Sequence, residues 1–377
     1  MSFVRLWAMA RKEFLHVLRD RRSLGLALAM PVFLLLLYGY ALTLDVDNVP
    51  MVVWDQSETS ASREFISRFA GSRYFSIRRY VRNYDEMVHA VDTRQVLTAL
   101  TVPRDFAQLL DSGRPASVQF ILDGSDSNTA TLAESYAEAV VATYTQEISL
   151  RAIRRQGGPA LHLPLEARPR VWYNADLESR SFIIPGLIAV IMMVIAALLT
   201  SLTVAREWER GTMEQLISTP VKTRELVLGK LIPYLVIGEL DVLLAVLLGQ
   251  FLFRVPLRGS VLLLFCLAMV FLVGTMSLGM VISIVAKNQL LANQMAMMLT
   301  YVPSFLLSGF VFPIANMPRL VQVITYLVPA RFFIVILKGI YLKGVGLEIL
   351  SLEALFLTVF AAAMVALANA LFKKKLT

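Results

Sequence analysis

Glu239 and Asp241 are the residues of this sequence whose types and surroundings most suggest chemistry. Both lie in the apolar stretch PYLVIGELDVLLAVLL, where an ionised aspartate costs about 2.5–3.5 kcal/mol inside a membrane. Such a carboxyl either functions, by binding a cation or a polar substrate group or by transferring a proton, or it is satisfied by polar side chains on neighbouring helices. Residues two apart point to different sides of a helix, so we expect two separate candidate intramembrane polar sites.

No set of residues typical of catalysis accompanies this pair. Three isolated histidines are spread along the chain: His16, His89 and His162. Asp123 and Asp126 flank a Gly-Ser turn, which is more typical of a helix cap than of a metal site. LGK at 228–230 lacks the earlier glycine and the following hydroxyl of a phosphate-binding loop. The sequence therefore predicts no catalytic residue, no cofactor, no metal and no ATP hydrolysis by this chain.

A charged segment, REWERGTMEQLISTPVKTRELVLGK at 206–230, joins two apolar stretches. Four of its residues follow helical spacing at i, i+3, i+4 and i+7: Glu207, Arg210, Gly211 and Glu214. We expect a short helix with one charged face, capped by Ser218 or Thr219, with Pro220 beginning the next helix. The alternative is a solvated loop that only marks one side of a membrane. A helix that joins two spans so tightly would transmit force to both.

The elements around this segment are those of an integral membrane protein. Of the 377 residues, 57% are hydrophobic and 17% are charged, whereas soluble domains contain about 25% charged residues. Six apolar stretches reach about the 20 residues that a span requires: 24–43, 182–204, 228–252, 260–286, 289–312 and 353–372. Pro329, Arg331 and Lys338 interrupt the segment 320–342, which we interpret as re-entrant or interfacial.

Basic residues cluster before the first of these stretches and after the last. Cytoplasmic loops collect Lys and Arg, so both termini and the charged segment are predicted to be cytoplasmic, and residues 45–180 to lie outside. Topology then explains the net charge of +8 better than nucleic-acid binding does. Arg254 and Arg258 fall in a predicted outer loop, against this rule. The long basic leader favours an uncleaved first span over a signal peptide.

Residues 3–20 have the period of an amphipathic helix. Its apolar positions are Phe3, Leu6, Trp7, Ala10, Phe14, Val17 and Leu18. Basic residues lie elsewhere on the helical wheel, as in helices that bind the membrane interface. We expect this helix to lie on lipid, where it could also contact a cytoplasmic partner; a solvated leader is the alternative.

Residues 45–180 alternate between strand and helix patterns. Strands are predicted at 51–55, 74–81, 95–102 and 116–123, and helices at 60–70, at 84–93, after Pro103 and at 129–155. This alternation indicates a compact α/β domain with a central sheet. Cys266 is the single cysteine, so no intrachain disulfide can stabilise the domain. Binding of a ligand or partner and shielding of an exit both stay open as its role.

The charged segment at 206–230 resembles the intracellular loop of ABC-2 type exporter permeases, the membrane subunits of ATP-binding cassette exporters. RKEFLHVLRDRRSL at 11–24 is similar to the leading amphipathic helix of that family. LSGFVFPIANMP at 307–318 and LVPARFFIVILKGIYLKG at 327–344 are similar to its re-entrant outer segment. The long first outer loop resembles that of larger members related to drug or sodium efflux permeases. The resemblance covers nearly the whole chain, and the acidic pair in the third span departs from it.

The resemblance implies an α-helical integral membrane protein with six transmembrane helices, like a type V exporter, and an inserted extracytoplasmic α/β domain. The implied parts are a connecting helix at 1–22, a first span at 23–44, the outer domain at 45–180, and the remaining spans at 181–377 with a coupling loop at 205–222 and a re-entrant segment at 313–345. The coupling helix, which would dock on the ATP-binding subunit, comprises Glu207, Glu209, Arg210, Gly211, Thr212 and Glu214. The connecting helix beside it comprises Arg11, Lys12, Glu13, Arg19 and Asp20.

The implied function is export across a bacterial inner membrane. The implied partners are an ABC ATP-binding subunit that holds ATP and Mg, a second permease copy or paralogue, membrane lipid and, as a further candidate, a periplasmic adaptor. A hypothesis of another class is a membrane sensor or scaffold, in which the outer domain binds a ligand and the helices relay a signal. The substrate, and the choice between homodimer and heterodimer, stay open.

Overall fold

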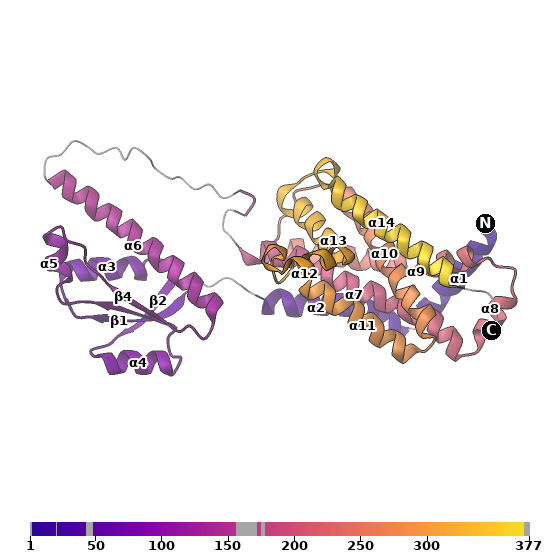
Figure 1. Cartoon of the computed structure of the whole chain (residues 1–377), viewed down its shortest axis with the longest axis horizontal. Coiled ribbons are helices and arrows are strands. Elements are labelled where there is room, and N and C mark those ends of the chain that lie inside the picture. The colour runs from indigo at the N-terminus through magenta and orange to yellow at the C-terminus, as the bar shows by residue number, and fades with distance from the viewer. Residues whose placement is uncertain (1, 20, 43–47, 156–171, 175–177, 373–377) are drawn as a thin grey trace. The chain divides into compact units, whose positions relative to one another are not determined.

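The computed structural model describes residues 2–19, 21–42, 48–155, 172–174 and 178–372. The chain forms two compact units. One unit comprises Met1–Thr43 with Arg170–Thr377, and the other comprises Leu44–Pro169. Figure 1 shows the elements of both units.

The unit Leu44–Pro169 is built on a four-stranded sheet of order β2-β1-β3-β4. The strands are β1 (Val49–Asp55), β2 (Phe75–Tyr80), β3 (Thr98–Val102) and β4 (Gln119–Leu122). β1 pairs in parallel with β2 and β3, and β4 pairs antiparallel with β3. The helices are α3 (Ser60–Ala70), α4 (Tyr84–Asp92), α5 (Phe106–Asp111) and α6 (Ser127–Arg155). Each predicted strand and helix of this region overlaps an observed one.

Both faces of this sheet are covered by apolar side chains. Phe65 and Phe69 of α3 pack with Met51 and Leu100 of the sheet in one buried cluster, and α3 and α6 lie on that side in Figure 1. On the opposite side, Met87 of α4 packs in a second cluster. The unit therefore has its own hydrophobic core, as an isolated domain without a disulfide requires.

The other unit is helical throughout the part that the structure describes. Its helices are α1 (Phe3–Arg19), α2 (Arg21–Ala41), α7 (Ser179–Glu209), α8 (Thr212–Ser218), α9 (Thr223–Leu247), α10 (Val261–Ala286), α11 (Gln289–Leu306), α12 (Arg319–Ile324), α13 (Pro329–Lys338) and α14 (Leu347–Leu371). Short turns of 3₁₀ or π-helix add η1 (Leu248–Leu252), η2 (Ile314–Asn316), η3 (Thr325–Leu327) and η4 (Gly339–Lys343).

Four helices of the described residues are long and apolar enough to cross a membrane: Ser179–Glu209, Thr223–Leu252, Val261–Ala286 and Leu347–Leu371. The pair Arg319–Leu327 and Pro329–Lys343 is bent by 84° and would be a fifth if counted as one span. In α2 the apolar part is the shorter helix Ala27–Ala41, and α11 ends at Leu306, before the predicted 312. Six spans therefore stay a prediction.

α7 lies at the centre of this unit. In α7, 83% of the most apolar window is buried, against 22% in α14. α10 approaches it closely at Gly279, where a methyl group would collide with the carbonyl oxygen of Ala197 and with Thr200 Oγ1. Thr200 Oγ1 donates a hydrogen bond of 2.7 Å to the carbonyl oxygen of Met276. The two helices are therefore in close contact at Gly279.

Candidate functional site

The charged segment is broken into two helices at Gly211. α7 continues to Glu209, Gly211 has φ = 71°, and α8 then runs over Thr212–Ser218. A left-handed backbone conformation strains any residue with a Cβ, and glycine adopts it freely. The predicted single helix face through Glu207, Arg210, Gly211 and Glu214 is therefore wrong. The prediction that Pro220 begins the next helix is also wrong, since α9 begins at Thr223.

The break divides the predicted coupling residues into two groups. Glu207 is 8% exposed and faces the protein interior. Four others are exposed: Glu209, Arg210, Gly211 and Glu214, with Thr212 half-buried. Glu209 Oε1 accepts a hydrogen bond of 2.8 Å from the backbone N–H of Gln289, at the start of α11. Of the charged coupling residues, Arg210 and Glu214 are thus exposed and make no ion pair in the described part of the chain.

Glu207 belongs to an ion cluster with Glu13, Lys230 and Lys12, in which the first three side chains are buried and Lys12 is exposed. Lys230 Nζ lies 2.9 Å from Glu13 Oε1 and 3.0 Å from Glu207 Oε1. Lys12 Nζ lies 3.0 Å from Glu207 Oε1. Two positive and two negative side chains therefore neutralise one another. Buried charges are strongly destabilising unless they are paired, so this ion cluster holds α1, α7 and α9 in one arrangement.

Pairing within the ion cluster favours the charged forms of Glu13 and Lys12. Burial alone would raise the pKa of the Glu13 carboxyl, but the neighbouring Lys230 and Lys12 hold it below its ordinary value. Burial alone would lower the pKa of the Lys12 ammonium, but Glu207 and Glu13 raise it above its ordinary value. Both groups are consequently charged at neutral pH.

A second set of contacts holds α1 to the start of α9. The backbone N–H of Ser2 donates to Glu225 Oε1 at 2.6 Å, and that of Lys222 donates to Glu225 Oε2 at 2.9 Å. Arg5 Nη1 donates to the carbonyl oxygen of Pro220. Further along, a methyl group on Gly229 would lie 2.7 Å from Met9 Cβ. α1 and α9 therefore approach each other closely at Gly229, with the contacts of Glu225 on one side of it and the ion pair of Glu13 with Lys230 on the other.

The predicted apolar face of α1 is divided between protein and surface. Ala10 and Val17 are buried against the protein, with Met9 and Glu13. Phe3 and Trp7 are 75% and 58% exposed. Among the predicted connecting-helix residues, Arg11, Lys12 and Arg19 are exposed and Glu13 is buried; Asp20 lies outside the described residues. The outward side chains keep the composition of a membrane-interface helix.

Glu239 and Asp241 differ in burial. Asp241 is 1% exposed, and neither of its carboxyl oxygens has a hydrogen-bond partner among the described residues. Glu239 is half-buried, with Oε1 unpartnered there. The alternative in which polar side chains on neighbouring helices satisfy the carboxyl is therefore not observed for Asp241. Such a group is a functional candidate, because its retention costs stability.

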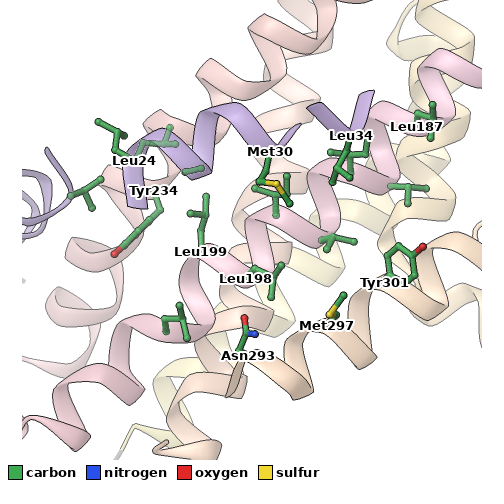
Figure 2. A pocket seen from close by; sticks show the side chains of 18 of the residues that line it. Leu24, Met30, Leu34, Leu187, Leu198, Leu199, Tyr234, Asn293, Met297 and Tyr301 are labelled. Carbon is green, nitrogen blue, oxygen red and sulfur yellow. The ribbon is translucent and has the colours of Figure 1, made fainter. Parts of the chain in front are cut away.

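Two adjoining hollows complete the site. The first, here called the apolar groove, has a volume of about 620 Å³ and is lined by α2, α7, α9, α11 and the end of α1. Figure 2 shows its side chains, among them Met30, Leu34 and Leu198, with Asn293 and Tyr301 as polar exceptions on α11. The second, here called the polar pocket, has a volume of about 430 Å³ and is lined by the ion cluster and α8.

Sequence reasoning missed Lys230, which was considered only as part of LGK. A lysine within an apolar stretch requires a buried acid, and Glu13 stands between Ala10 and Val17 on the apolar side of the α1 wheel. These two signals together would have indicated the pair. The described residues contain no group of three or more His, Cys, Asp or Glu that could hold a metal ion.

The family model described as "ABC-2 family transporter protein" matches residues 21–369. The chain belongs to the ABC-2 transporter family. The family predicted from the sequence is confirmed, and this ABC-2 transporter protein is an integral membrane protein with four or five candidate spans in its described part.

Its relatives include three proteins of Escherichia coli (strain K12). The chain is 35% identical over 368 residues to the "Probable multidrug ABC transporter permease YbhS", covering 97% of this chain and 96% of the relative. It is 32% identical over 373 residues to the "Probable multidrug ABC transporter permease YbhR", covering 99% of each. It is 25% identical over 328 residues to the "Inner membrane transport permease YhhJ", covering 86% and 85%.

Proposed function

We propose that this ABC-2 transporter protein is the membrane permease subunit of an ABC exporter. A separate ATP-binding subunit docks on residues 205–220 and binds ATP and Mg, while the permease forms the translocation pathway as a dimer with a second copy or a paralogue. The names of the similar E. coli proteins, two of them multidrug permeases, support this assignment. It places the chain in the inner membrane with six spans and both termini in the cytoplasm.

One structural relationship carries the proposal. α8 is short, borders the exposed Arg210 and Gly211, and joins the candidate spans of α7 and α9 through a few residues on each side. The ion cluster ties the end of α7 to α9 and to α1. A partner that displaced α8 would therefore move both spans and α1 together. We call residues 205–220 the lever, because force applied to them would be transmitted to these helices. Packed elements that move as one are suited to transmitting a conformational change.

The remaining parts have roles consistent with this assignment. The exposed Phe3 and Trp7 of α1 would contact membrane lipid at the cytoplasmic surface. The unit Leu44–Pro169 would lie outside, where a periplasmic adaptor is a candidate partner. The bent pair Arg319–Leu327 and Pro329–Lys343 would be the re-entrant outer segment.

Charge reversal on the exposed part of the lever tests the proposal. Glu214→Lys and Arg210→Glu should each reduce co-purification of an ATP-binding subunit from native membranes and reduce ATP-driven export. Glu348→Lys, at an exposed glutamate of α14, is the matched control and should change neither. Glu207 is unsuitable for this test, because its reversal would break the ion cluster.

Intact complexes and unchanged export in both variants would refute docking at α8. Purification with no ATP-binding subunit at all, together with a ligand response of the isolated chain, would instead support the sensor hypothesis.

A further inference from the structure

The apolar groove and the polar pocket adjoin, and their chemistry is opposite. We infer that together they form one binding site for an anionic amphiphile, with its hydrocarbon chain in the apolar groove and its phosphate or carboxylate in the polar pocket. The identification of this ligand as cargo rests on the proposed function, whereas its binding does not.

The two hollows adjoin, because they share lining residues. His16, Arg206 and Tyr234 line both. Arg206 Nη1 lies 3.4 Å from His16 Nε2, so these two side chains stand together where the groove meets the pocket. Their volumes of about 620 Å³ and 430 Å³ both fall in the range of about 300–1,000 Å³ typical of sites for small ligands. A single ligand that occupied both would pass beside His16 and Arg206.

The apolar groove offers almost nothing to a polar ligand. Apart from Tyr38 and Arg206, its walls on α2 and α7 are leucine, isoleucine, valine, alanine and methionine side chains, and Figure 2 shows carbon atoms almost throughout. Asn293 and Tyr301 are the labelled polar side chains of its α11 wall. Burial of apolar surface is the favourable term in such a place, so the part of the ligand that enters here is hydrocarbon.

The polar pocket has an excess of positive charge. The charges of Lys12 and Lys230 are cancelled by Glu13 and Glu207 within the ion cluster. Arg206 and Arg210 also line the pocket, and neither has a carboxylate within ion-pair distance in the described part of the chain. A guanidinium binds phosphate or carboxylate through two parallel hydrogen bonds.

The apolar groove and the polar pocket together favour an amphiphile over a small anion or a neutral hydrocarbon. A small inorganic anion would satisfy the arginines but leave the apolar groove empty. A neutral hydrocarbon would fill the groove but leave Arg206 uncompensated at its mouth. An amphiphile with an anionic head satisfies both halves, and it could reach the groove from the inner leaflet of the membrane.

Binding is tested on the full chain in phosphatidylcholine nanodiscs, with radiolabelled dodecyl phosphate as the probe and empty nanodiscs as the blank. Unlabelled dodecyl phosphate should compete, whereas dodecanol and inorganic phosphate, which carry only the tail or only the head, should compete at least about tenfold less well. Equal competition by dodecanol or by inorganic phosphate would overturn the inference.

Variants locate the site. Arg206→Gln should weaken binding about tenfold, the loss expected from one charge-assisted contact, and Arg206→Lys should retain most of it. Leu198→Trp, which fills the apolar groove, should weaken binding without changing charge. Arg79→Gln, an exposed arginine of the other unit, should bind like the parent. Unchanged binding in Arg206→Gln and Leu198→Trp, with normal gel-filtration profiles, would overturn the site.

A transport assay distinguishes a ligand that is exported from one that only stays bound. In proteoliposomes that contain the permease and its ATP-binding subunit, ATP should drive accumulation of dodecyl phosphate on the side opposite the ATP-binding subunit. Binding without ATP-driven movement, in a complex that still hydrolyses ATP, would overturn the assignment as cargo. Absence of an ATP-binding subunit would instead contradict the proposed function and leave the binding result intact.

Discussion

Lys230 Nζ lies 2.9 Å from Glu13 Oε1, although 217 residues separate the two along the chain. Lys230 is 1% exposed and Glu13 5%, so the pair lies inside the protein, between α9 and α1. The same ammonium contacts Glu207 at the end of α7. The proposed lever depends on this arrangement, because it makes three helices respond as one to force applied at α8.

Removing Lys230 should strongly destabilise the helical unit. Lys230→Met leaves Glu13 and Glu207 with Lys12 alone, and breaking a buried ion pair typically lowers the free energy of unfolding by about 3–5 kcal/mol. Lys12→Met should cost much less, since that side chain is 49% exposed and water screens it. The double variant Lys230→Met with Glu13→Leu should recover part of the loss. Thermal unfolding in detergent measures all three; equal melting temperatures for Lys230→Met and the parent would show that the ion cluster does not stabilise the fold.

Low pH should weaken the attachment of α1 to α9, because it protonates the Glu13 carboxylate that pairs with Lys230. The folded-state pKa of Glu13 lies below its ordinary value, so its stabilising contribution is fully present above the unfolded pKa, about 4.3. That contribution is lost as pH falls through the lower folded-state pKa. The raised pKa of Lys12 acts oppositely, and its contribution is lost only above about pH 10.4. The contribution of these two groups to stability should therefore be flat from about pH 5 to 10 and fall below about pH 4.

Glu13→Gln should flatten the acid limb of this profile at a lower overall stability. An acid limb of the same steepness in Glu13→Gln would assign the pH dependence to other carboxyls.

Gly211 should tolerate asparagine better than alanine. Its φ of 71° costs a residue with a Cβ about 1–2 kcal/mol, while asparagine visits this conformation more readily. No atom lies within 4 Å of a Cβ built at this position, so steric collision is not the cause. Export should fall in Gly211→Ala and fall less in Gly211→Asn, with both proteins expressed equally. The reverse order would mean that the turn geometry is not what matters here.

Much of the fold is readable from local patterns, and the site largely is not. Alternating strand and helix patterns located β1, α3 and the other elements of Leu44–Pro169, because each pattern reflects a side-chain periodicity within a few residues. The break at Gly211 was missed because its helical spacing continues across the turn. The pairing of Glu13 with Lys230 was missed because its two signals lie 217 residues apart, and each was visible only as one charged residue within an apolar pattern.

Close packing of α10 on α7 should make Gly279 intolerant of substitution. Gly279→Ala would place a methyl group against the Ala197 carbonyl and Thr200 Oγ1, and overpacking of this kind costs about 1–3 kcal/mol. Gly25→Ala, also within a helix, is the matched control, because nothing lies within 4 Å of a Cβ there. Melting temperatures in detergent compare the two; no difference between them would show that the helices can separate at Gly279.

Neutral variants should distinguish stability from transport at the intramembrane carboxyls. Asp241→Leu removes a buried group with no hydrogen-bond partner in the described residues, and should raise the melting temperature because an unsatisfied polar group costs about 1–3 kcal/mol. If Asp241 acts in transport, the same variant should lose export while the complex still hydrolyses ATP. Normal export by both Glu239→Gln and Asp241→Asn would assign these residues no transport role.

The central claim is that this chain supplies a pathway and a lever, and that a docked partner supplies the energy. A photo-crosslinking amino acid in place of Glu214 tests it most directly, with irradiation of intact cells and identification of the product by mass spectrometry. We predict a crosslink to an ATP-binding subunit, and none when the same amino acid replaces Glu348. Crosslinks from position 214 only to lipid, or to proteins outside the cytoplasm, would contradict the account.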